Sequence, residues 1–468
     1  MHNNKAFQLL RTFNTWELRS LDDFLRSPFF NKQESVIRLW EHLWPLCPAL
    51  EDESLERKQL FEVIWPRESF QERRLRYLLT DFSRLIERFW AYKDWADDSA
   101  RYDETLLWAY QKRALPKYQA QTRQRYERRL ASDLRLSAEL LQHRFQLAEF
   151  DLLTQKDQFS RPRSVQEVLE SLDEMYLLRH LRYACEGVNR SRIFAESPQT
   201  PLTPLLLEAL ASRNSQNSLI EAYRLSYLML TDTEHEAAYF ALKAVLWTDP
   251  VWDTLDLDAL HSLALNYCIG RLNAGIESFR LESFEMYRQS LEKGVLLDKA
   301  GYLEDNHYKN LVALGARLKE YQWTESFIES YRERLYPSAA ENAYRYNLAY
   351  LQMAQQQYSQ VLRLLAQVEF TNVFYQLGAK TILARVYYET EEYESLLMLL
   401  KNFGAYLRRE KSLSSQQRVL YLNFARVLKL MTRYQSGESV LRSKIESTLA
   451  QYHEIAAKQW ILEKMALL

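Results

Sequence analysis

Histidine and cysteine are common zinc ligands, but their spacing in this chain does not form a ligand set. The eight histidines are scattered, and the pairs His180 with Cys185 and His261 with Cys268 are five and seven residues apart. A structural zinc site needs four ligands, and no further cysteine or histidine follows either pair at a ligand spacing. We therefore predict no metal site and expect both pairs to pack in a helical core.

Phosphate-binding loops and catalytic motifs are also missing from the sequence. The glycine pair Gly270 and Gly275 is followed by Ile276 and Glu277, where a phosphate-binding loop has lysine and then serine or threonine. The chain contains no GxSxG, HExxH, CxxC or calcium-loop pattern. We expect a protein that is not an enzyme, with no catalytic residues, no cofactor and no small-molecule substrate. An enzyme whose site follows none of these motifs is the third interpretation.

Four carboxylates lie close together in one short segment. A pair of carboxylates could act as a general acid and a general base. The four are Glu389, Glu391, Glu392 and Glu394. The segment lies between two helical patterns, and a turn exposes its side chains to water. We therefore predict that these glutamates are solvated.

The most basic part of the chain is the stretch 112–135, where eight basic side chains stand against two acidic ones. A helix with this charge and with the interleaved Tyr118 and Tyr126 could follow a phosphate backbone and stack on bases. The other interpretation is a solvated cationic face that pairs with acidic helices elsewhere in the chain. A nucleic-acid-binding role would use Arg123, Arg125, Arg128 and Arg129.

The scarcity of glycine predicts the fold class. Only 9 glycines and 11 prolines occur in 468 residues, whereas typical usage is about 7% and 5%. Turns and bulges use glycine and helices exclude it, so we predict an all-α protein. The net charge of −1 gives the whole molecule no field that would draw it to nucleic acid or to an anionic membrane.

The cysteines and the apolar segments bear on the compartment. The three cysteines are odd in number and widely separated, which is typical of reduced thiols. The N-terminal residues contain no apolar run of signal-peptide length, and no segment approaches the roughly 18 apolar residues of a membrane span. We therefore expect a cytoplasmic protein that does not enter the membrane.

The N-terminal part carries helix-start signals, in which a capping side chain precedes a carboxylate by three residues. They are Asn14 with Glu17, Asn31 with Glu34, and Ser69 with Glu72. From 70 to 90, apolar residues recur every three or four positions, which predicts a long helix with one buried stripe. Residues 1–95 are therefore predicted to form an N-terminal helical bundle around this helix.

Three further segments are predicted beyond the bundle. Residues 96–197 form long helices with the basic face, and the prolines Pro198, Pro201 and Pro204 mark a linker. Residues 198–335 form degenerate helix pairs, one of them with its turn at Gly270 to Gly275 and another with Trp323 in its turn. Residues 336–468 form clearer repeats and a C-terminal capping helix, in which Trp460, Ile461 and Met465 cover the last apolar face.

One pattern of small and bulky residues occurs three times between Glu341 and Leu441. A small residue is followed after 9, 12 and 16 positions by tyrosine, a small or aliphatic residue, and leucine. The copies are Ala349, Tyr358, Val361 and Leu365; Ala384, Tyr393, Leu396 and Leu400; and Ala425, Tyr434, Gly437 and Leu441. Small residues let two helices approach, while tyrosine and leucine fill the groove between neighbouring pairs. The spacing therefore predicts paired helices.

This pattern resembles the tetratricopeptide repeat, a unit of about 34 residues made of two antiparallel helices. Gly437 departs from the family, which prefers alanine at that position, and the first half of the chain shows no clear copies. Residues 25–33 and 322–331 are also similar to uncharacterised bacterial helical-repeat proteins, a resemblance that implies no function. The predicted fold is thus an N-terminal helical bundle followed by an α-solenoid of tetratricopeptide-like helix pairs.

The resemblance implies that the first helices of the pairs line a concave surface. The partner-binding residues it implies are Tyr346, Tyr350, Arg385, Tyr388, Arg426 and Lys429, with Met353, Thr381 and Leu422 at the remaining positions. Family members that hold a C-terminal carboxylate use lysine and asparagine at successive repeats. Asn347 and Asn423 match that pattern, but Ile382 interrupts it.

A groove of tyrosines and cations suits an extended peptide with acidic and apolar side chains. We therefore expect a non-catalytic scaffold or adaptor that binds a protein or peptide partner on the concave face. The alternative function is a nucleic-acid-associated helical-repeat protein that uses residues 112–135. The groove residues could also pack against a neighbouring helix or simply face water.

Overall fold

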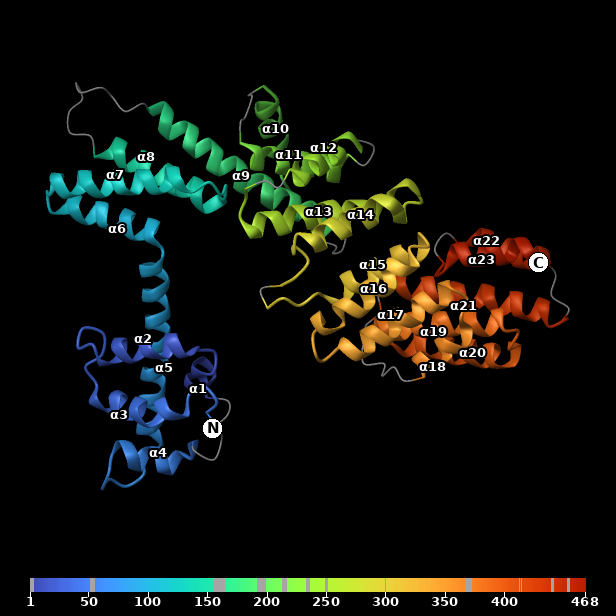
Figure 1. The fold of residues 1–468 in the computed structure, drawn as a ribbon, viewed down its shortest axis with the longest axis horizontal. Helices are drawn as coiled ribbons and strands as arrows, with labels where there is room; N and C mark the ends of the chain where they lie inside the picture. The colour runs from blue at the N-terminus through green and yellow to red at the C-terminus, as the bar shows by residue number, and fades with distance from the viewer. Residues whose placement is uncertain are drawn as a thin grey trace. The chain divides into compact units, whose positions relative to one another are not determined.

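A computed structural model describes most of the chain as helices (Figure 1). The described residues are 4–50, 55–154, 165–191, 199–212, 217–232, 236–248, 251–298, 300–366, 373–411, 413, 415–438, 442–452 and 455–468. Within these ranges no strand forms, and isolated bridges join Leu303 with Leu297 and with Leu335. The prediction of an all-α protein is confirmed. No helix in these ranges combines the length and apolar composition of a membrane span.

The chain divides into two compact units, residues 1–176 and residues 177–468. The division falls inside helix α9 (Val165–Ser191). Pro198 lies outside the described residues, and Pro204 occupies the second position of α10 (Thr203–Ser212), where a helix tolerates proline. The four segments inferred from the sequence therefore remain a prediction.

A long helix organises the first part of unit 1. Helix α5 (Glu72–Asp97) contacts α1 (Lys5–Leu10), α2 (Thr15–Arg26), α3 (Glu34–Leu43) and α4 (Arg57–Ile64), as Figure 1 shows. Its apolar stripe is buried, which confirms the helix inferred from the sequence. The buried stripe residues are Leu75, Leu78, Leu79, Phe82, Leu85, Ile86 and Phe89.

One of the three helix-start signals forms a capping box. The Asn14 side chain accepts from the Glu17 backbone N–H at 2.9 Å, and the Glu17 carboxylate accepts from the Asn14 N–H at 3.0 Å. The signals at Asn31 and Ser69 are wrong, because α3 and α5 start after Gln33 and Gln71 without a side-chain cap. Asn31 is buried instead, and its amide donates to the Leu25 carbonyl at 2.9 Å.

The rest of unit 1 consists of three helices that pack together. They are α6 (Ser99–Lys112), α7 (Pro116–Ser132) and α8 (Ala138–Leu153). Pro116 begins α7, at a position where a helix tolerates proline because the N–H has no intrahelical partner. A buried cluster around Tyr126, Leu107 and Phe150 joins the three helices.

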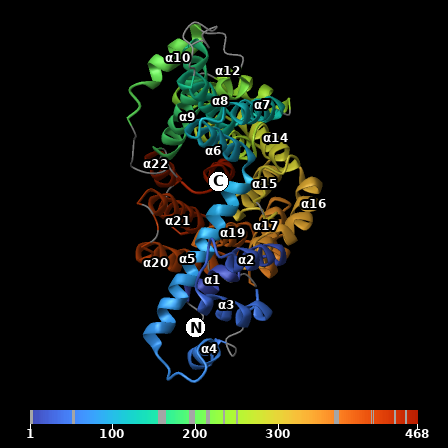
Figure 2. The same cartoon turned by 90° about the vertical axis from the view of Figure 1, so that its left-hand side faces the viewer.

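Unit 2 consists largely of helices that follow one another in contacting pairs (Figures 1 and 2). The pairs are α11 (Ser218–Thr231) with α12 (Glu236–Trp247), α13 (Thr254–Asn273) with α14 (Ser278–Glu292), α15 (Asp305–Arg317) with α16 (Tyr321–Tyr331), α17 (Ala340–Ala354) with α18 (Tyr358–Leu365), α19 (Val373–Glu389) with α20 (Tyr393–Arg409), and α21 (Ser415–Gln435) with α22 (Arg442–Gln451). First helices also touch, since α11 contacts α13, α15 contacts α17, and α17 contacts α19. Helix α23 (Lys458–Leu467) contacts α21.

The first two copies of the repeat occupy equivalent places. Ala349 and Ala384 are buried on the first helices, and Tyr358 and Tyr393 begin the second helices. The third copy differs, because α21 is longer and still contains Tyr434. Its turn follows at Gly437, whose φ of 81° favours glycine, and Leu441 lies outside the described residues.

The degenerate pairs fall close to their predicted places. Gly275 lies in the turn between α13 and α14 with a φ of 90°, whereas Gly270, which was also predicted in this turn, lies within α13. Trp323 lies within α16 instead of the turn before it, and its ring stacks on Phe327 with the centroids 5.4 Å apart. Sequential helix pairing therefore extends through unit 2 from α11 to α22.

Candidate functional site

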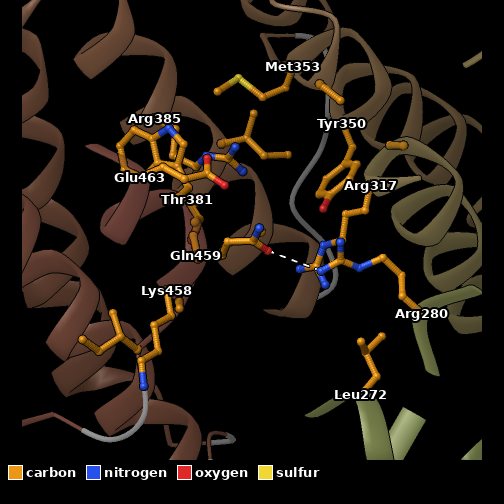
Figure 3. Close-up of a pocket in the computed structure, with 18 of the residues that line it drawn as sticks. Leu272, Arg280, Arg317, Tyr350, Met353, Thr381, Arg385, Lys458, Gln459 and Glu463 are labelled. Atoms are coloured by element: carbon orange, nitrogen blue, oxygen red, sulfur yellow. Dashed lines mark hydrogen bonds between the residues drawn. The ribbon is translucent and has the colours of Figure 1, made fainter. Parts of the chain in front are cut away.

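The first helices of several pairs line a cavity of about 660 Å³ in unit 2. We call it the basic cavity, because five basic side chains line it against two acidic ones. The basic side chains are Arg280, Arg317, Lys319, Arg385 and Lys458, and the acidic ones are Glu277 and Glu463. Figure 3 shows Arg280, Arg317 and Tyr350 gathered on one side and Arg385 with Glu463 on the other.

The structure places three of the six predicted groove residues in this cavity. Tyr346, Tyr350 and Arg385 line it. Met353 and Thr381, which the resemblance also placed on the first helices, line it too. The cavity therefore joins residues from α17 and α19 with residues from α13, α15, α21 and α23.

The other three predicted groove residues lie elsewhere. Tyr388 is buried and packs edge to face on Trp460, with ring centroids 5.5 Å apart. Arg426 and Lys429 are exposed on α21, and Arg426 donates to the Tyr452 hydroxyl at 3.3 Å. The structure thus does not bring these three side chains to the cavity wall.

Arg385 is the most enclosed cation of the cavity. Burial lowers the pKa of its guanidinium below the usual value, and the positive charge of Arg317 lowers it further, against the opposing effects of Tyr350, Glu389 and Glu463. Arginine stays protonated in proteins, so the group is a partly buried positive charge at neutral pH. Among the described residues, no acceptor bonds to its buried Nε–H. An entering anion would gain a donor and a charge that the protein leaves undersatisfied.

Arg280 is partly neutralised within the wall. It forms an ion pair with Glu277, and its Nη2 donates to the Gln459 amide oxygen at 3.4 Å (Figure 3). Arg317 and Lys319, in contrast, are exposed at the end of α15 and in the turn that follows. The positive charge that a ligand would meet first therefore comes from these two side chains.

The wall around Tyr346 depends on a glycine. The Tyr346 ring lies over Gly378 of α19, where an added Cβ would stand 2.1 Å from the Tyr346 hydroxyl and 2.8 Å from its Cζ. No real Cβ tolerates such distances, so the ring would have to move. Tyr346 is also held by an edge-to-face contact with Tyr375, with ring centroids 4.9 Å apart.

We predict that Gly378→Ala destabilises the protein by about 1–3 kcal/mol, the usual cost of overpacking a core. Alanine alone would favour the helix by about 1 kcal/mol, so the steric effect must exceed the helix propensity. Urea unfolding measures the difference.

The matched control is Gly404→Ala in α20, where the nearest atom to an added Cβ is 3.9 Å away. This variant is expected to gain about 0.5–1 kcal/mol from helix propensity. Equal stability of the two variants would show that the space around Gly378 is not limiting.

The carboxylate-clamp positions are not available to a ligand. Asn347 is 1% exposed, and its amide donates to the Ala343 carbonyl of its own helix at 2.8 Å. Asn423 is buried as well. A clamp of the family type therefore has no accessible amides here.

Three of the eight basic side chains of the stretch 112–135 form ion pairs with helices α6 and α8. Arg123 binds both carboxylate oxygens of Asp151 on α8, with Nε–Oδ1 at 2.7 Å and Nη2–Oδ2 at 2.9 Å. Arg125 and Arg129 both pair with Asp103 of α6, which is 1% exposed. Arg128 is exposed. Three of the four candidate arginines therefore hold α7 against its neighbours.

The histidine and cysteine pairs lie in helical cores. His261 is buried, and its Nδ1 lies 2.8 Å from the Ser290 hydroxyl. Burial lowers the pKa of His261 to about 4, so it is neutral at physiological pH. Cys185 and Cys268 are buried free thiols, and burial raises the pKa of Cys268 to about 12. In the part of the chain that the structure describes, no three metal-ligating side chains lie together.

One glutamate of the turn segment is not solvated, which corrects the sequence-based prediction. The Glu389 oxygens accept from the Trp460 indole N–H and from the Lys464 ammonium, each at 2.7 Å. Glu391, Glu392 and Glu394 are exposed, as predicted. The partners of Glu389 lie some 70 residues away in the sequence, so no local pattern indicates them. Arg280 and Arg317 occupy no position of the repeat pattern, so the sequence did not indicate them as cavity residues either.

No protein-family model matches this chain, and neither a curated protein nor a solved structure is significantly similar to it.

Proposed function

We propose that this protein is a non-catalytic cytoplasmic adaptor built from tetratricopeptide-like helix pairs, and that it binds an acidic segment of a partner protein in the basic cavity. The observation that carries the proposal is the convergence of Arg317, Lys319 and Arg385 on one cavity lined by first helices. Guanidinium groups form strong charge-assisted hydrogen bonds with carboxylates, and the neighbouring tyrosines offer apolar contact.

The size and openness of the site support a segment of a macromolecule. A volume of about 660 Å³ admits several side chains, and the cavity lies along successive helices. The wall also mixes cations with the faces of Tyr346, Tyr350 and Tyr421. Such a surface fits an extended chain in which acidic and apolar side chains alternate.

Selection of peptides from a random display library on the immobilised full chain tests this proposal. The selected peptides are expected to be enriched in Asp and Glu. For one such peptide, Arg317→Glu should weaken binding about tenfold, because a charge-assisted contact becomes a repulsion. Arg317 is exposed, so far-UV circular dichroism should stay unchanged.

The matched control is Arg363→Glu, the same charge reversal at an exposed position of the second helix α18. The affinity of this variant for the peptide is expected to stay within about twofold of the wild-type value, because surface charges separated from the ligand by more than a Debye length of roughly 8 Å are screened. Selected peptides without an excess of acidic residues, or equal loss in both variants, would rule out an acidic partner in this cavity.

The nucleic-acid alternative has less support. Arg123, Arg125 and Arg129 would have to break ion pairs with Asp151 and Asp103 before they could bind phosphate groups. A rise in the fluorescence anisotropy of labelled RNA or DNA on addition of the full chain, reduced by salt, would support this alternative.

A further inference from the structure

The C-terminal helix α23 lies across the first helices of two successive pairs. Its Trp460 contacts Tyr388 and Arg385 of α19, with the Arg385 guanidinium 5.3 Å from the indole centroid. Just before it, the Ala456 N–H donates to the Leu420 carbonyl of α21 at 3.3 Å. A helix that only extended the row of pairs would meet α21 and α22. Helix α23 instead also reaches α19, on the face that the first helices form.

The Glu389 carboxylate binds two side chains that lie one turn apart on α23. Glu389 Oε1 accepts from the Trp460 Nε1–H and Glu389 Oε2 accepts from Lys464 Nζ, each at 2.7 Å. The side chains of Glu389 and Lys464 are 15% and 23% exposed, so little water screens this pair. Residues four apart lie on the same face of a helix, which is why one glutamate can bind both.

Apolar contacts complete the fit. Trp460, Ile461 and Met465 are buried in the cluster that contains Phe424, Leu428 and other residues of α21. These three residues of α23 therefore cover the apolar face of α21, and Trp460 is the aromatic anchor of the contact. Buried aromatic anchors dominate the affinity of protein interfaces.

Helix α23 is suited to leave this position. It has ten residues, and an isolated helix shorter than about 12 residues is marginal in water, so its helicity depends on docking. Lys458, Gln459, Trp460 and Glu463 of α23 also form one wall of the basic cavity, so a ligand in that cavity would contact α23. Figure 3 shows Glu463 beside Arg385, where an acidic ligand would also bind.

We infer that the surface formed by Arg385, Tyr388 and Glu389 of α19 with α21 is a binding site for an amphipathic partner helix. The partner helix carries an indole and, four residues later, an ammonium group. In the free protein α23 occupies this site as an internal ligand, and the partner helix displaces it. This inference goes beyond the proposed function, because the site selects a helix with a cation, whereas the basic cavity selects an acidic segment.

A labelled peptide of residues 455–468, added to the full chain, tests the inference. An internal ligand competes at an effective concentration near millimolar, so binding to the wild-type chain is expected to be weak. In the Trp460→Ala/Lys464→Ala chain, which we call the weakened chain, α23 docks less tightly. This chain should bind the peptide at least tenfold more tightly than the wild-type chain. Leu462 is 46% exposed, so the Leu462→Ala peptide should bind within twofold of the parent peptide.

A charge exchange between the chain and the peptide tests whether Glu389 binds the lysine of the partner helix. In the weakened chain, Glu389→Lys should reduce peptide binding at least tenfold, and the Lys464→Glu peptide should recover most of the loss. A weakened chain with wild-type helicity that does not bind the peptide, or a Glu389→Lys chain that binds it unchanged, overturns the inference. Arg317→Glu is expected to weaken acidic-peptide binding about tenfold and to leave the helical peptide bound, so the two proposals can fail separately.

Amide hydrogen exchange of the wild-type chain provides a second test that does not depend on how the variants fold. Residues 458–467 are expected to exchange at least tenfold faster than the buried turns of α19, because α23 leaves the site while the rest stays folded. Equal protection of the two helices would show that α23 is a permanent part of the core and would overturn the inference.

Discussion

Raising the pH above about 10 is expected to unfold unit 2 in one cooperative step, because that is where exposed tyrosine ionises. Unit 2 contains several buried tyrosines, among them five whose pKa is raised well above the ordinary value by burial. They are Tyr223, Tyr239, Tyr308, Tyr346 and Tyr375. Their neutral hydroxyls are stable inside the fold, and their phenolates are not.

The sign follows from proton binding in the two states. Below about pH 10 both states hold these protons, so the stabilisation is fully present. As the pH rises from there toward the folded-state pKa values, the unfolded chain releases protons that the folded chain keeps. Each group then costs about 1.4 kcal/mol per pH unit, so five groups cost about 7 kcal/mol over one unit. Typical stabilities are only about 5–15 kcal/mol, so unfolding near pH 11 is expected.

Tyrosinate absorbance and far-UV circular dichroism, recorded together, measure this transition. The expected result is a coincident steep change in both signals. A Tyr239→Phe variant removes one ionising group and should lower the dependence of the unfolding free energy on pH by about 1.4 kcal/mol per unit. Complete titration of the tyrosines with the native dichroism intact would refute the burial argument.

The second large effect is expected from Asp256→Ala, at about 3–5 kcal/mol of lost stability, the usual result of breaking a buried ion pair. Asp256 of α13 is completely buried and accepts from the Tyr223 hydroxyl of α11 at 2.6 Å. Arg182 of α9 lies 3.5 Å from the same carboxylate oxygen. The substitution leaves a buried hydroxyl and a partly buried guanidinium without this acceptor, so three helices lose their common polar contact.

Urea unfolding of Asp256→Ala, with Asp258→Ala as control, measures this effect. Asp258 is half-buried, and burial raises its pKa, so its removal is expected to change stability by no more than about 0.5 kcal/mol. The double variant Asp256→Leu/Tyr223→Phe should lose less than the sum of the single losses, because both partners of one bond are removed together. Equal stability of the two alanine variants would contradict a structural role for Asp256.

Local sequence patterns were sufficient to predict the helices and their pairing. The scarcity of glycine excludes strand-rich folds, and the spacing of Ala349, Tyr358 and Leu365 places a small contact and two groove-filling residues on neighbouring helices. The stripe of α5 is similarly local. These signals hold because the period of a helix determines which residues share a face, whatever the helix later packs against.

The capping pattern was wrong at two positions, and three of the four arginines of the predicted basic face form ion pairs. The capping signals at Asn31 and Ser69 have the right spacing, but Asn31 bonds to the Leu25 carbonyl across a corner of the fold. The basic stripe of α7 suggested a phosphate-binding face, yet Asp103 and Asp151 arrive from α6 and α8 to pair with it. In both cases a partner outside the local segment decided how the side chain was used.

The sequence by itself thus determined the all-helical fold, the pairing of helices in unit 2, and the presence of Tyr346, Tyr350 and Arg385 on first helices. Only the tertiary structure decided that these residues meet Arg280 and Arg317 around one cavity, and that Glu389 binds Trp460 and Lys464. The reason is that a helical period specifies a face over a few turns. Which faces converge depends on how successive pairs stack, and that is set by packing between residues far apart in the chain.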